Sequence, residues 1–226
     1  MIPGRDLASS DAVRAYLVEQ LNLALRRPGM FGGKIAIRML FDHLLFVEQR
    51  PQVWNEEQHA LQQRGAFAST GVQGVLDALL PRDHGHGMSS VYAEIARRQG
   101  RLVADRVLDG AAYASLRESA GEWAARDRVW SDVLARFGPP SILFGGTNPL
   151  YGKTLGYLSE DAGQPMVFFH LWNGTDDDAE QPWPPTDPEP LLLAVRHGDG
   201  PFRDTFTFTP EGRRRKPAPP PSPLSE

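Results

Sequence analysis

The residues that come closest to a known binding motif are the Gly-Lys-Thr triplet that ends SILFGGTNPLYGKT, residues 141–154. A phosphate-binding P-loop has the form G-x-x-x-x-G-K-[ST], in which backbone N–H groups and the lysine surround the phosphates. Here the first glycine of that form falls on Thr147, and Pro149 removes an N–H donor from the loop. LGYLSEDAGQP follows where the motif needs a helix. The spacing therefore argues against nucleotide binding at Lys153 and favours a turn between two strands.

Two histidines that are close in sequence, His84 and His86, are the candidate metal ligands. With Asp83 they offer the imidazole and carboxylate groups that zinc and other transition metals bind. Glycines flank both histidines, and the spacing of the remaining histidines and glutamates does not match HExxH. A solvated loop is the preferred interpretation, so we predict no metal and no cofactor. An enzyme of unknown type, metal-dependent through His84 and His86, is the alternative.

Other catalytic motifs are missing from the sequence. A serine hydrolase needs a GxSxG elbow, and the chain has none; Ser89 and Ser90 have the character of residues that start a helix. The run Asp176–Asp178 lacks the alternating acidic ligands of an EF-hand loop and its closing glutamate. A solvated acidic loop is the better interpretation of that run.

A recognition surface is the remaining hypothesis. Two segments that end neighbouring predicted strands combine aromatic rings, amides, a hydroxyl and open backbone N–H groups. Such a mixture is typical of sites that bind peptides or small ligands. In the competing interpretation the aromatic rings pack on the sheet and the asparagines satisfy turns. The predicted partner-binding residues are Gly145, Gly146, Thr147, Asn148, Tyr151, His170, Trp172 and Asn173.

A second glycine-rich segment, Arg27-Pro28-Gly29-Met30-Phe31-Gly32-Gly33, lies between two predicted helices. It resembles the RPGMYIG segment of type II topoisomerase ATPase subunits, but the chain lacks the Asp-x-Gly-x-Gly loop of that family. It also resembles the corresponding turn of small uncharacterised bacterial proteins of immunity-protein type. That resemblance covers seven residues and implies an immunity-like function without identifying site residues.

The composition is that of an ordinary globular protein. The 226 residues are 41% hydrophobic and 23% charged, with a formal net charge of −4. This charge gives no general attraction for nucleic acid. The absence of cysteine excludes disulfides and thiolate chemistry. With no apolar segment long enough for a signal peptide or a membrane span, we expect a cytoplasmic protein that binds neither nucleic acid nor membranes.

The hydrophobic pattern predicts helices first and strands afterwards, which is an α+β order. About six helices are expected within residues 10–138, starting at Ser10 and ending with one helix from about Ala120 to Phe137; Thr70 is the expected cap of the helix that begins GVQGVLDALL. After Pro140 the pattern predicts an antiparallel sheet of four or five strands. Trp123, Trp130 and Phe137 are expected to cover one face of that sheet. The predicted strands are 142–144, 154–158, 166–172, 191–196 and 204–209.

We therefore predict a single α+β domain over residues 1–210, with a helical part at 10–138, a β part at 141–210 and one continuous core. Residues 174–190 form a predicted mobile acidic loop, and residues 211–226 a predicted disordered tail rich in proline and arginine. As function we expect a non-catalytic cytoplasmic binding protein, immunity-like in one version, that recognises another protein or a small ligand.

Overall fold

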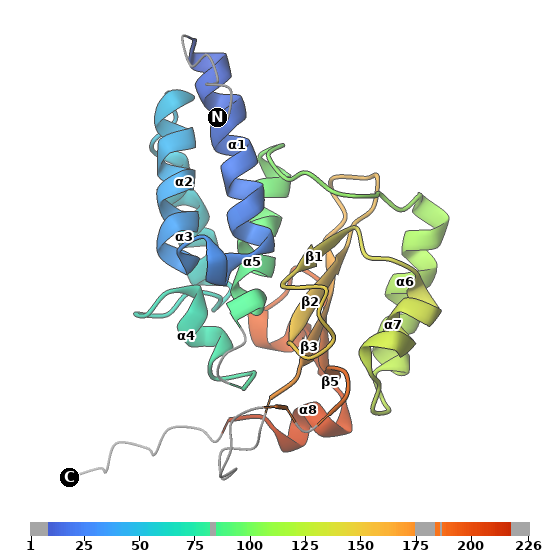
Figure 1. Ribbon diagram of the computed structural model, residues 1–226. Coiled ribbons are helices and arrows are strands. Elements are labelled where there is room, and N and C mark those ends of the chain that lie inside the picture. Colours follow the sequence, from blue (N-terminus) through green and yellow to red (C-terminus); the bar gives the residue numbers. More distant parts are fainter. Residues whose placement is uncertain (1–8, 82–84, 175–183, 186, 218–226) are drawn as a thin grey trace, which may run out of the picture.

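The computed structural model describes residues 9–81, 85–174, 184–185 and 187–217 (Figure 1). The predicted α+β class is confirmed: helices form most of the N-terminal half and pack against a C-terminal antiparallel sheet. In chain order the described elements are α1 (Ser10–Arg26), η1 (Pro28–Met30), α2 (Gly33–Val47), α3 (Val53–Gln63), α4 (Val72–Leu76), α5 (Gly85–Arg98), α6 (Gly110–Trp123), α7 (Trp130–Phe137), β1 (Ile142–Phe144), β2 (Lys153–Tyr157), β3 (Val167–Trp172), β4 (Leu191–Arg196), η2 (Phe202–Thr205), β5 (Phe206–Phe208) and α8 (Pro210–Arg214).

The sheet is a five-stranded antiparallel meander in the order β1-β2-β3-β4-β5. The connections β1–β2, β2–β3 and β4–β5 are too short for a crossover, so these neighbours pair antiparallel; β3 and β4 also pair antiparallel, across the longer connection at 173–190. Thr154 lies opposite His170, and a register irregularity between His170 and Leu171 shifts the pairing of β3 with β4. In β5 the rings of Phe206 and Phe208 stack at 5.8 Å between centroids on one face, as the strict alternation there predicts.

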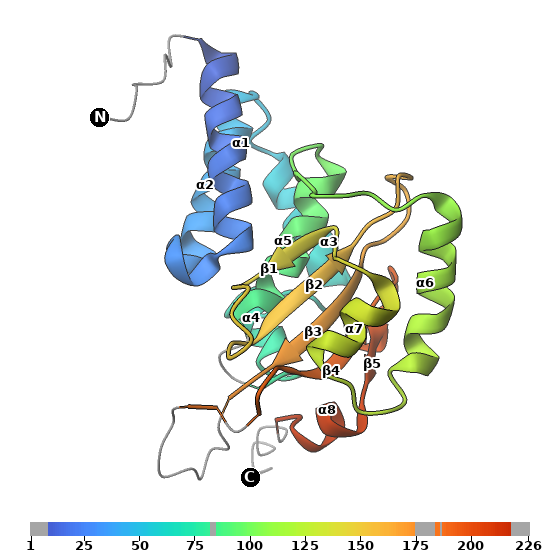
Figure 2. The same ribbon diagram turned by 45° about the vertical axis from the view of Figure 1, so that its right-hand side comes forward.

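Helices cover both faces of the sheet. Figure 2 shows α6 and α7 on one side of the sheet and α5 on the other, with α1 further to the left. Strand β3 is buried at every position, so its apolar residues point alternately into two cores. Val167 and Phe169 belong to the core under α6 and α7, whereas Phe168 belongs to the larger core under α1 to α5. The prediction of one continuous core was therefore wrong, because the sheet itself separates the two cores.

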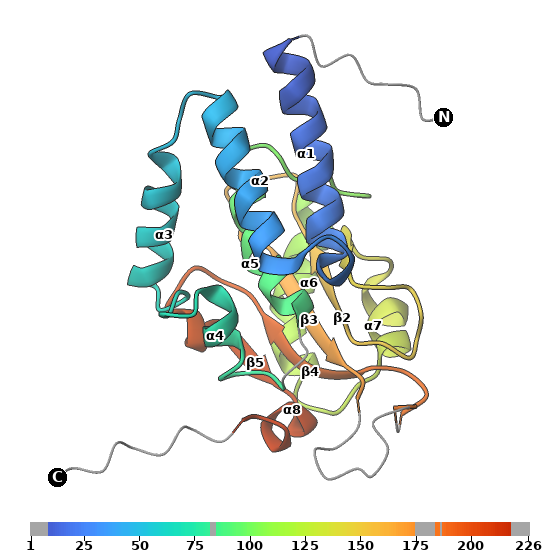
Figure 3. The same ribbon diagram turned by 60° about the vertical axis from the view of Figure 1, so that its left-hand side comes forward.

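Helices α1, α2 and α3 stand side by side at one end of the molecule (Figure 3). The N-cap of α1 is Ser9, whose hydroxyl accepts a hydrogen bond from Ala12 N at 3.2 Å, one residue before the predicted start. Gly32, in the left-handed conformation at φ 84°, precedes α2. A side chain would be strained there, so glycine lets the chain reverse direction between α1 and α2.

The predicted helix from Ala120 to Phe137 was wrong. The structure has two helices, α6 and α7, with an irregular segment between them. Trp123 and Phe137 pack edge to face at 5.1 Å and lie with Trp130 beside the smaller core, as partly buried residues. The fully buried side chain of α7 is Val133. The long helical pattern arose because two short amphipathic helices lie on the same face of one sheet.

Two other predicted helix starts were also wrong. Helix α4 begins after Gly71, not after Thr70. Helix α5 already includes Gly85, so Ser89 and Ser90 lie inside it and are buried. The glycines near position 85 suggested a loop, but packing of α5 against the sheet overrides that weak local preference.

The predicted tail begins too early. Residues 210–214 form α8, which packs on β4. Glu211 is buried and forms ion pairs with Arg214 and Arg215. A Cβ on Gly212 would lie 1.8 Å from the carbonyl oxygen of Leu193, so only glycine allows this approach. Residues 218–226 lie outside the described residues, as do residues 175–183 and 186 of the acidic loop.

Candidate functional site

The β1–β2 connection, residues 145–152, is a turn held by internal hydrogen bonds. Asn148 accepts a hydrogen bond from Leu150 N through Oδ1, at 2.9 Å, and Lys153 Nζ donates to the carbonyl oxygen of Asn148, also at 2.9 Å. Gly145 N donates to the carbonyl oxygen of Arg26 at 2.7 Å, which joins this loop to the end of α1. Strand β2 follows where a P-loop would have a helix, so the predicted turn between two strands is confirmed.

The structure brings together only part of the predicted recognition cluster. Thr147, Asn148 and Tyr151 are exposed, and Asn173 Nδ2 donates to the carbonyl oxygens of Pro149 at 3.4 Å and Asp187 at 3.0 Å. These contacts place the end of β3 beside the loop, as predicted. Gly145 is buried and Gly146 is partly exposed.

His170 and Trp172, the two residues of the predicted cluster that belong to β3, lie in the interior. His170 is buried, with Nδ1 3.2 Å from Thr154 Oγ1 and its ring stacked on Phe206 at 5.6 Å. Trp172 is buried under the guanidinium of Arg215, which lies 4.3 Å from the ring centroid. Both residues therefore stabilise the core, and neither offers its ring to a partner.

The structure joins two glycine-rich segments that the sequence analysis treated separately. Arg27, at the start of the RPGMFGG turn, lies against the loop, with Nη1 3.3 Å from the position of a Cβ on Gly146. His86, in the first turn of α5, lies against Gly145, with Nδ1 3.2 Å from the corresponding Cβ position. Turn, helix start and loop form one group, which we call the turn–loop cluster: Arg27, His86, Gly145, Gly146 and Lys153.

Positive charge dominates the turn–loop cluster. Burial, together with the positive charges of Lys153 and Arg27, lowers the pKa of His86 to about 4, so its imidazole is neutral at pH 7. Burial and the charge of Arg27 lower the pKa of Lys153 to about 8, against the opposing effect of Glu189. The Nζ of Lys153 lies 3.6 Å from the ring centroid of Trp130. Within the described residues, neither Arg27 nor Lys153 forms an ion pair with a carboxylate.

The metal-site hypothesis receives no support from this geometry. His84 lies outside the described residues, and His86 is held within α5 beside two cations. A nearby positive charge opposes the binding of a metal cation. The part of the chain that the structure describes contains no group of three or more potential metal ligands.

A different surface gathers exposed apolar side chains. Seven of the ten large apolar residues that are exposed in the described chain lie on α1, η1 and α2 or between them. On α2 itself, Ile35 is 67%, Met39 51% and Phe46 77% exposed. A groove of about 300 Å³ runs between α1 and α2, with mainly apolar walls. We call this surface the helical-hairpin face: Tyr16, Leu23, Met30, Phe31, Ile35, Met39 and Phe46.

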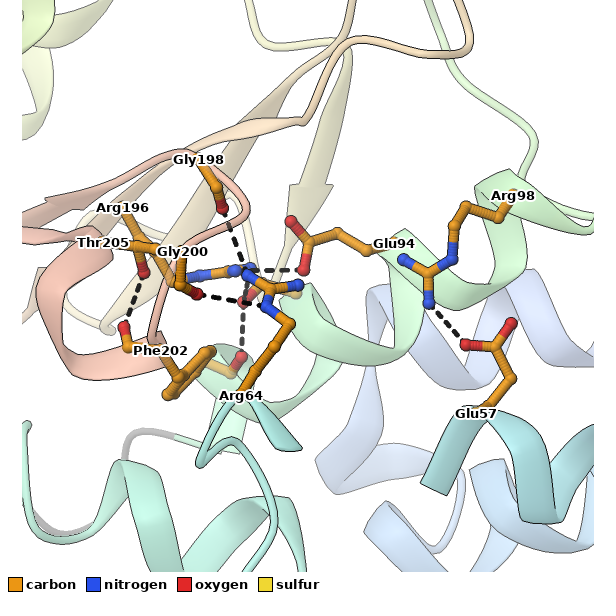
Figure 4. Close-up of polar contacts among 11 residues, drawn as sticks. Glu57, Arg64, Glu94, Arg98, Arg196, Gly198, Gly200, Phe202 and Thr205 are labelled. Atoms are coloured by element: carbon orange, nitrogen blue, oxygen red, sulfur yellow. Dashed lines mark hydrogen bonds and ion pairs between the residues drawn. The ribbon is translucent and has the colours of Figure 1, made fainter. Parts of the chain in front are cut away.

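A buried ion-pair network lies at the end of β4, between α5 and the turn that leads to η2 (Figure 4). The fully buried Arg196 donates to Glu94 Oε2 at 3.0 Å and to Ser90 Oγ at 3.1 Å. Arg64 donates to the carbonyl oxygens of Gly198 and Gly200, each at 3.2 Å. These bonds tie the turn after β4 to α3 and α5, which is a structural role.

Comparison of the chain with protein-family models, with curated proteins and with solved structures finds no match. Among the described helices, none combines the length and apolar character needed to cross a membrane. The helical-hairpin face and the turn–loop cluster are therefore features of the described chain that bear on function. The residues of the turn–loop cluster were already notable in the sequence, whereas the helical-hairpin face was not predicted. Apolar residues on both sides of α2 were the sequence signal that could have revealed this face.

Proposed function

We propose that this chain is a non-catalytic binding protein that docks a partner protein on its helical-hairpin face. The observation that carries the proposal is the apolar character of α2 on two opposite sides. One side, with Ile37, Phe41 and Leu44, is buried in the larger core. The other side, with Met39 and Phe46, is exposed. Packing on one core needs a single apolar stripe, so the exposed apolar side chains are a second stripe on the same helix.

The shape of the face suits a helical or extended apolar segment of the partner. The groove between α1 and α2 has Tyr16 and Phe31 on its walls and Met39 and Leu40 along its length. An amphipathic helix can place its apolar side chains into such a groove at successive turns. Methionine adapts its flexible side chain to the partner's shape, and Met30 and Met39 contribute two such side chains.

Large contiguous apolar patches on soluble proteins generally mark interaction sites. The patch therefore supports the class of function expected from the sequence, a binding protein, but moves the proposed contact from the β1–β2 loop to the helical hairpin. An immunity-type function, in which the partner is a toxin, is the specific version that the RPGMFGG resemblance implies. A cytoplasmic location is part of the same proposal.

Site-specific photo-crosslinking in the native host tests the proposal. A photoreactive residue at Met39 should form an adduct with one partner species, because the side chain lies in the groove. The matched control is a photoreactive residue at Glu118, which is exposed on α6 on the other side of the molecule. An adduct that forms from Met39 and is lost with Phe31→Glu supports the proposal. Equal labelling from Met39 and Glu118, or no adduct from Met39, contradicts it.

The mass of the adduct identifies the partner class. An adduct of twice the mass of the chain would show that the face joins two copies, and would replace the partner-protein proposal by a homodimer. Circular dichroism of each variant shows whether it is folded, so a loss of crosslinking is interpreted only for a folded chain.

A further inference from the structure

A pocket of about 270 Å³ lies between α6, the end of α7 and the chain segment that leads into α6. These elements are on the side of the sheet that α6 and α7 cover, away from the helical-hairpin face (Figure 2). The volume corresponds to roughly nine water molecules at about 30 Å³ each. The pocket is therefore large enough for a small organic molecule with about that number of non-hydrogen atoms.

Two arginines from different elements line this pocket. Arg106 belongs to the segment before α6, and Arg136 to the last turn of α7. Within the described chain neither guanidinium forms an ion pair with a carboxylate, whereas the buried Arg101 and Arg196 are neutralised by Glu48 and Glu94. Two cations that share a pocket without an internal counter-charge favour the binding of an external anion.

The hydrogen bonding of Arg106 is incomplete. Its Nη2 donates to the carbonyl oxygen of Phe137 at 3.0 Å, which fixes the guanidinium in the pocket wall. Among the described residues its Nε, although buried, has no hydrogen-bond acceptor, and Nη1 donates to none either. A buried donor without an acceptor is costly. Since this side chain has no carboxylate partner, an acceptor group that enters the pocket is the remaining way to satisfy it.

The rest of the pocket wall is mainly apolar. Leu108 and Leu116 are buried members of the smaller core, and Phe137 packs against the same core. Ser119, which also lines the pocket, already donates its hydroxyl to the carbonyl oxygen of Ser115 at 2.8 Å. Pockets that combine apolar walls with a few charged groups are typical of sites for small organic ligands. The walls thus favour an anion with an apolar body over a bare inorganic anion.

We propose that this pocket binds a small organic monocarboxylate with an apolar body of about six carbon atoms. The carboxylate pairs with Arg136 and Arg106, because the planar guanidinium group matches the two oxygens of a carboxylate. The apolar body lies on the leucine and phenylalanine side chains of the wall. This site is independent of the docking proposed for the helical-hairpin face, so either proposal can fail without the other.

Calorimetry and NMR on the full chain test the proposal, with benzoate and hexanoate as probes. Both should bind and should shift the amide signals of Ser115 and Ser119, but not that of Met39 in the groove of the helical-hairpin face. Hexanamide, which lacks the charge, and acetate, which lacks the apolar body, should each bind at least about tenfold more weakly. In Arg136→Gln the affinity for benzoate should fall about tenfold, as expected for one charge-assisted hydrogen bond.

The matched control is Arg117→Gln, which removes an exposed cation of α6 whose side chain donates to Gln164 Oε1 at 3.1 Å and does not line the pocket. This variant should retain the wild-type affinity at physiological ionic strength. Arg136 is exposed, so its variant should fold, and its melting temperature checks this. The proposal is overturned if neither carboxylate binds at millimolar concentrations, if hexanamide binds as well as hexanoate, or if both variants weaken binding to the same extent. Tighter binding of inorganic phosphate than of benzoate would overturn the assignment to an organic carboxylate.

Discussion

The capping of α8 by Thr209 provides a sharp test of the fold. The sequence pattern suggested a disordered segment after Pro210, whereas the structure has a docked helix there. The hydroxyl of Thr209, fully buried, accepts a hydrogen bond from Gly212 N at 3.0 Å and donates one to the carbonyl oxygen of Leu192 at 2.7 Å. One hydroxyl thus begins α8 and fastens it to β4.

The expected cost of Thr209→Ala follows from these two hydrogen bonds. Loss of a threonine N-cap costs about 1–2 kcal/mol, and loss of a buried hydrogen bond costs about 1 kcal/mol more. The total is roughly 2–3 kcal/mol. In a domain of this size, 1 kcal/mol corresponds to about 2–4 °C in melting temperature. We therefore expect Thr209→Ala to lower the melting temperature by about 4–12 °C in a calorimetric scan.

Thr70→Ala is the matched control, because the sequence pattern assigned Thr70 as a helix cap. In the structure Gly71 precedes α4 and no side chain caps that helix, so Thr70→Ala should lower the melting temperature by less than about 2 °C. Thr209→Ser, which keeps the hydroxyl, should recover most of the loss. If Thr209→Ala changes the melting temperature by less than about 2 °C, or if Thr70→Ala has an equal effect, then the Thr209 hydroxyl does not stabilise α8 in the way described.

Three further predictions concern the buried charged groups and α8. Glu94→Ala should lower the free energy of unfolding by about 3–5 kcal/mol in urea titrations, because it leaves Arg196 buried without its counter-charge; a loss below about 1 kcal/mol would contradict the buried pair. The folded-state pKa of His86 is about 4 against the usual 6.5, so the unfolded chain binds the proton first and stability should fall as pH decreases from 6.5 to 4. His86→Gln should show a smaller fall, and an identical profile would refute the shift. A chain ending at Pro210 should melt several degrees below one ending at Pro217, because only the first lacks the docked residues of α8; equal melting temperatures would mean that α8 contributes nothing.

Local patterns were sufficient for the sheet. The strands at 142–144 and 191–196 have the predicted bounds, and the other three differ by a few residues at their ends. Each strand is a short run of β-branched and aromatic residues between glycine or proline breakers, and both signals act within a few residues. The antiparallel order followed from connections that are short or, at 173–190, have no helical pattern.

Helix boundaries in the first half depended on packing between distant segments. No signal within residues 120–137 shows that the chain turns at 124–129, because α6 and α7 present apolar residues to the same sheet. Likewise, the glycines at 85 and 87 do not reveal that α5 extends through them. Propensity differences of about 1 kcal/mol are outweighed when a helix buries its face against a sheet.

In the candidate sites, too, some features follow from the local sequence and others only from contacts between distant segments. From sequence alone one can identify the RPGMFGG turn, the GGTNP loop and His86 as unusual segments, because their residue types are unusual. Sequence alone does not show that Arg27 and His86 lie against Gly145 and Gly146, or that His170 and Trp172 are buried. Those facts arise from contacts between residues far apart in the chain, and the pKa of Lys153 follows from the same contacts. Residue type and spacing therefore determined the strands of the sheet, whereas burial and electrostatic environment were decided only by the tertiary structure, because both depend on which distant segments displace water from a side chain.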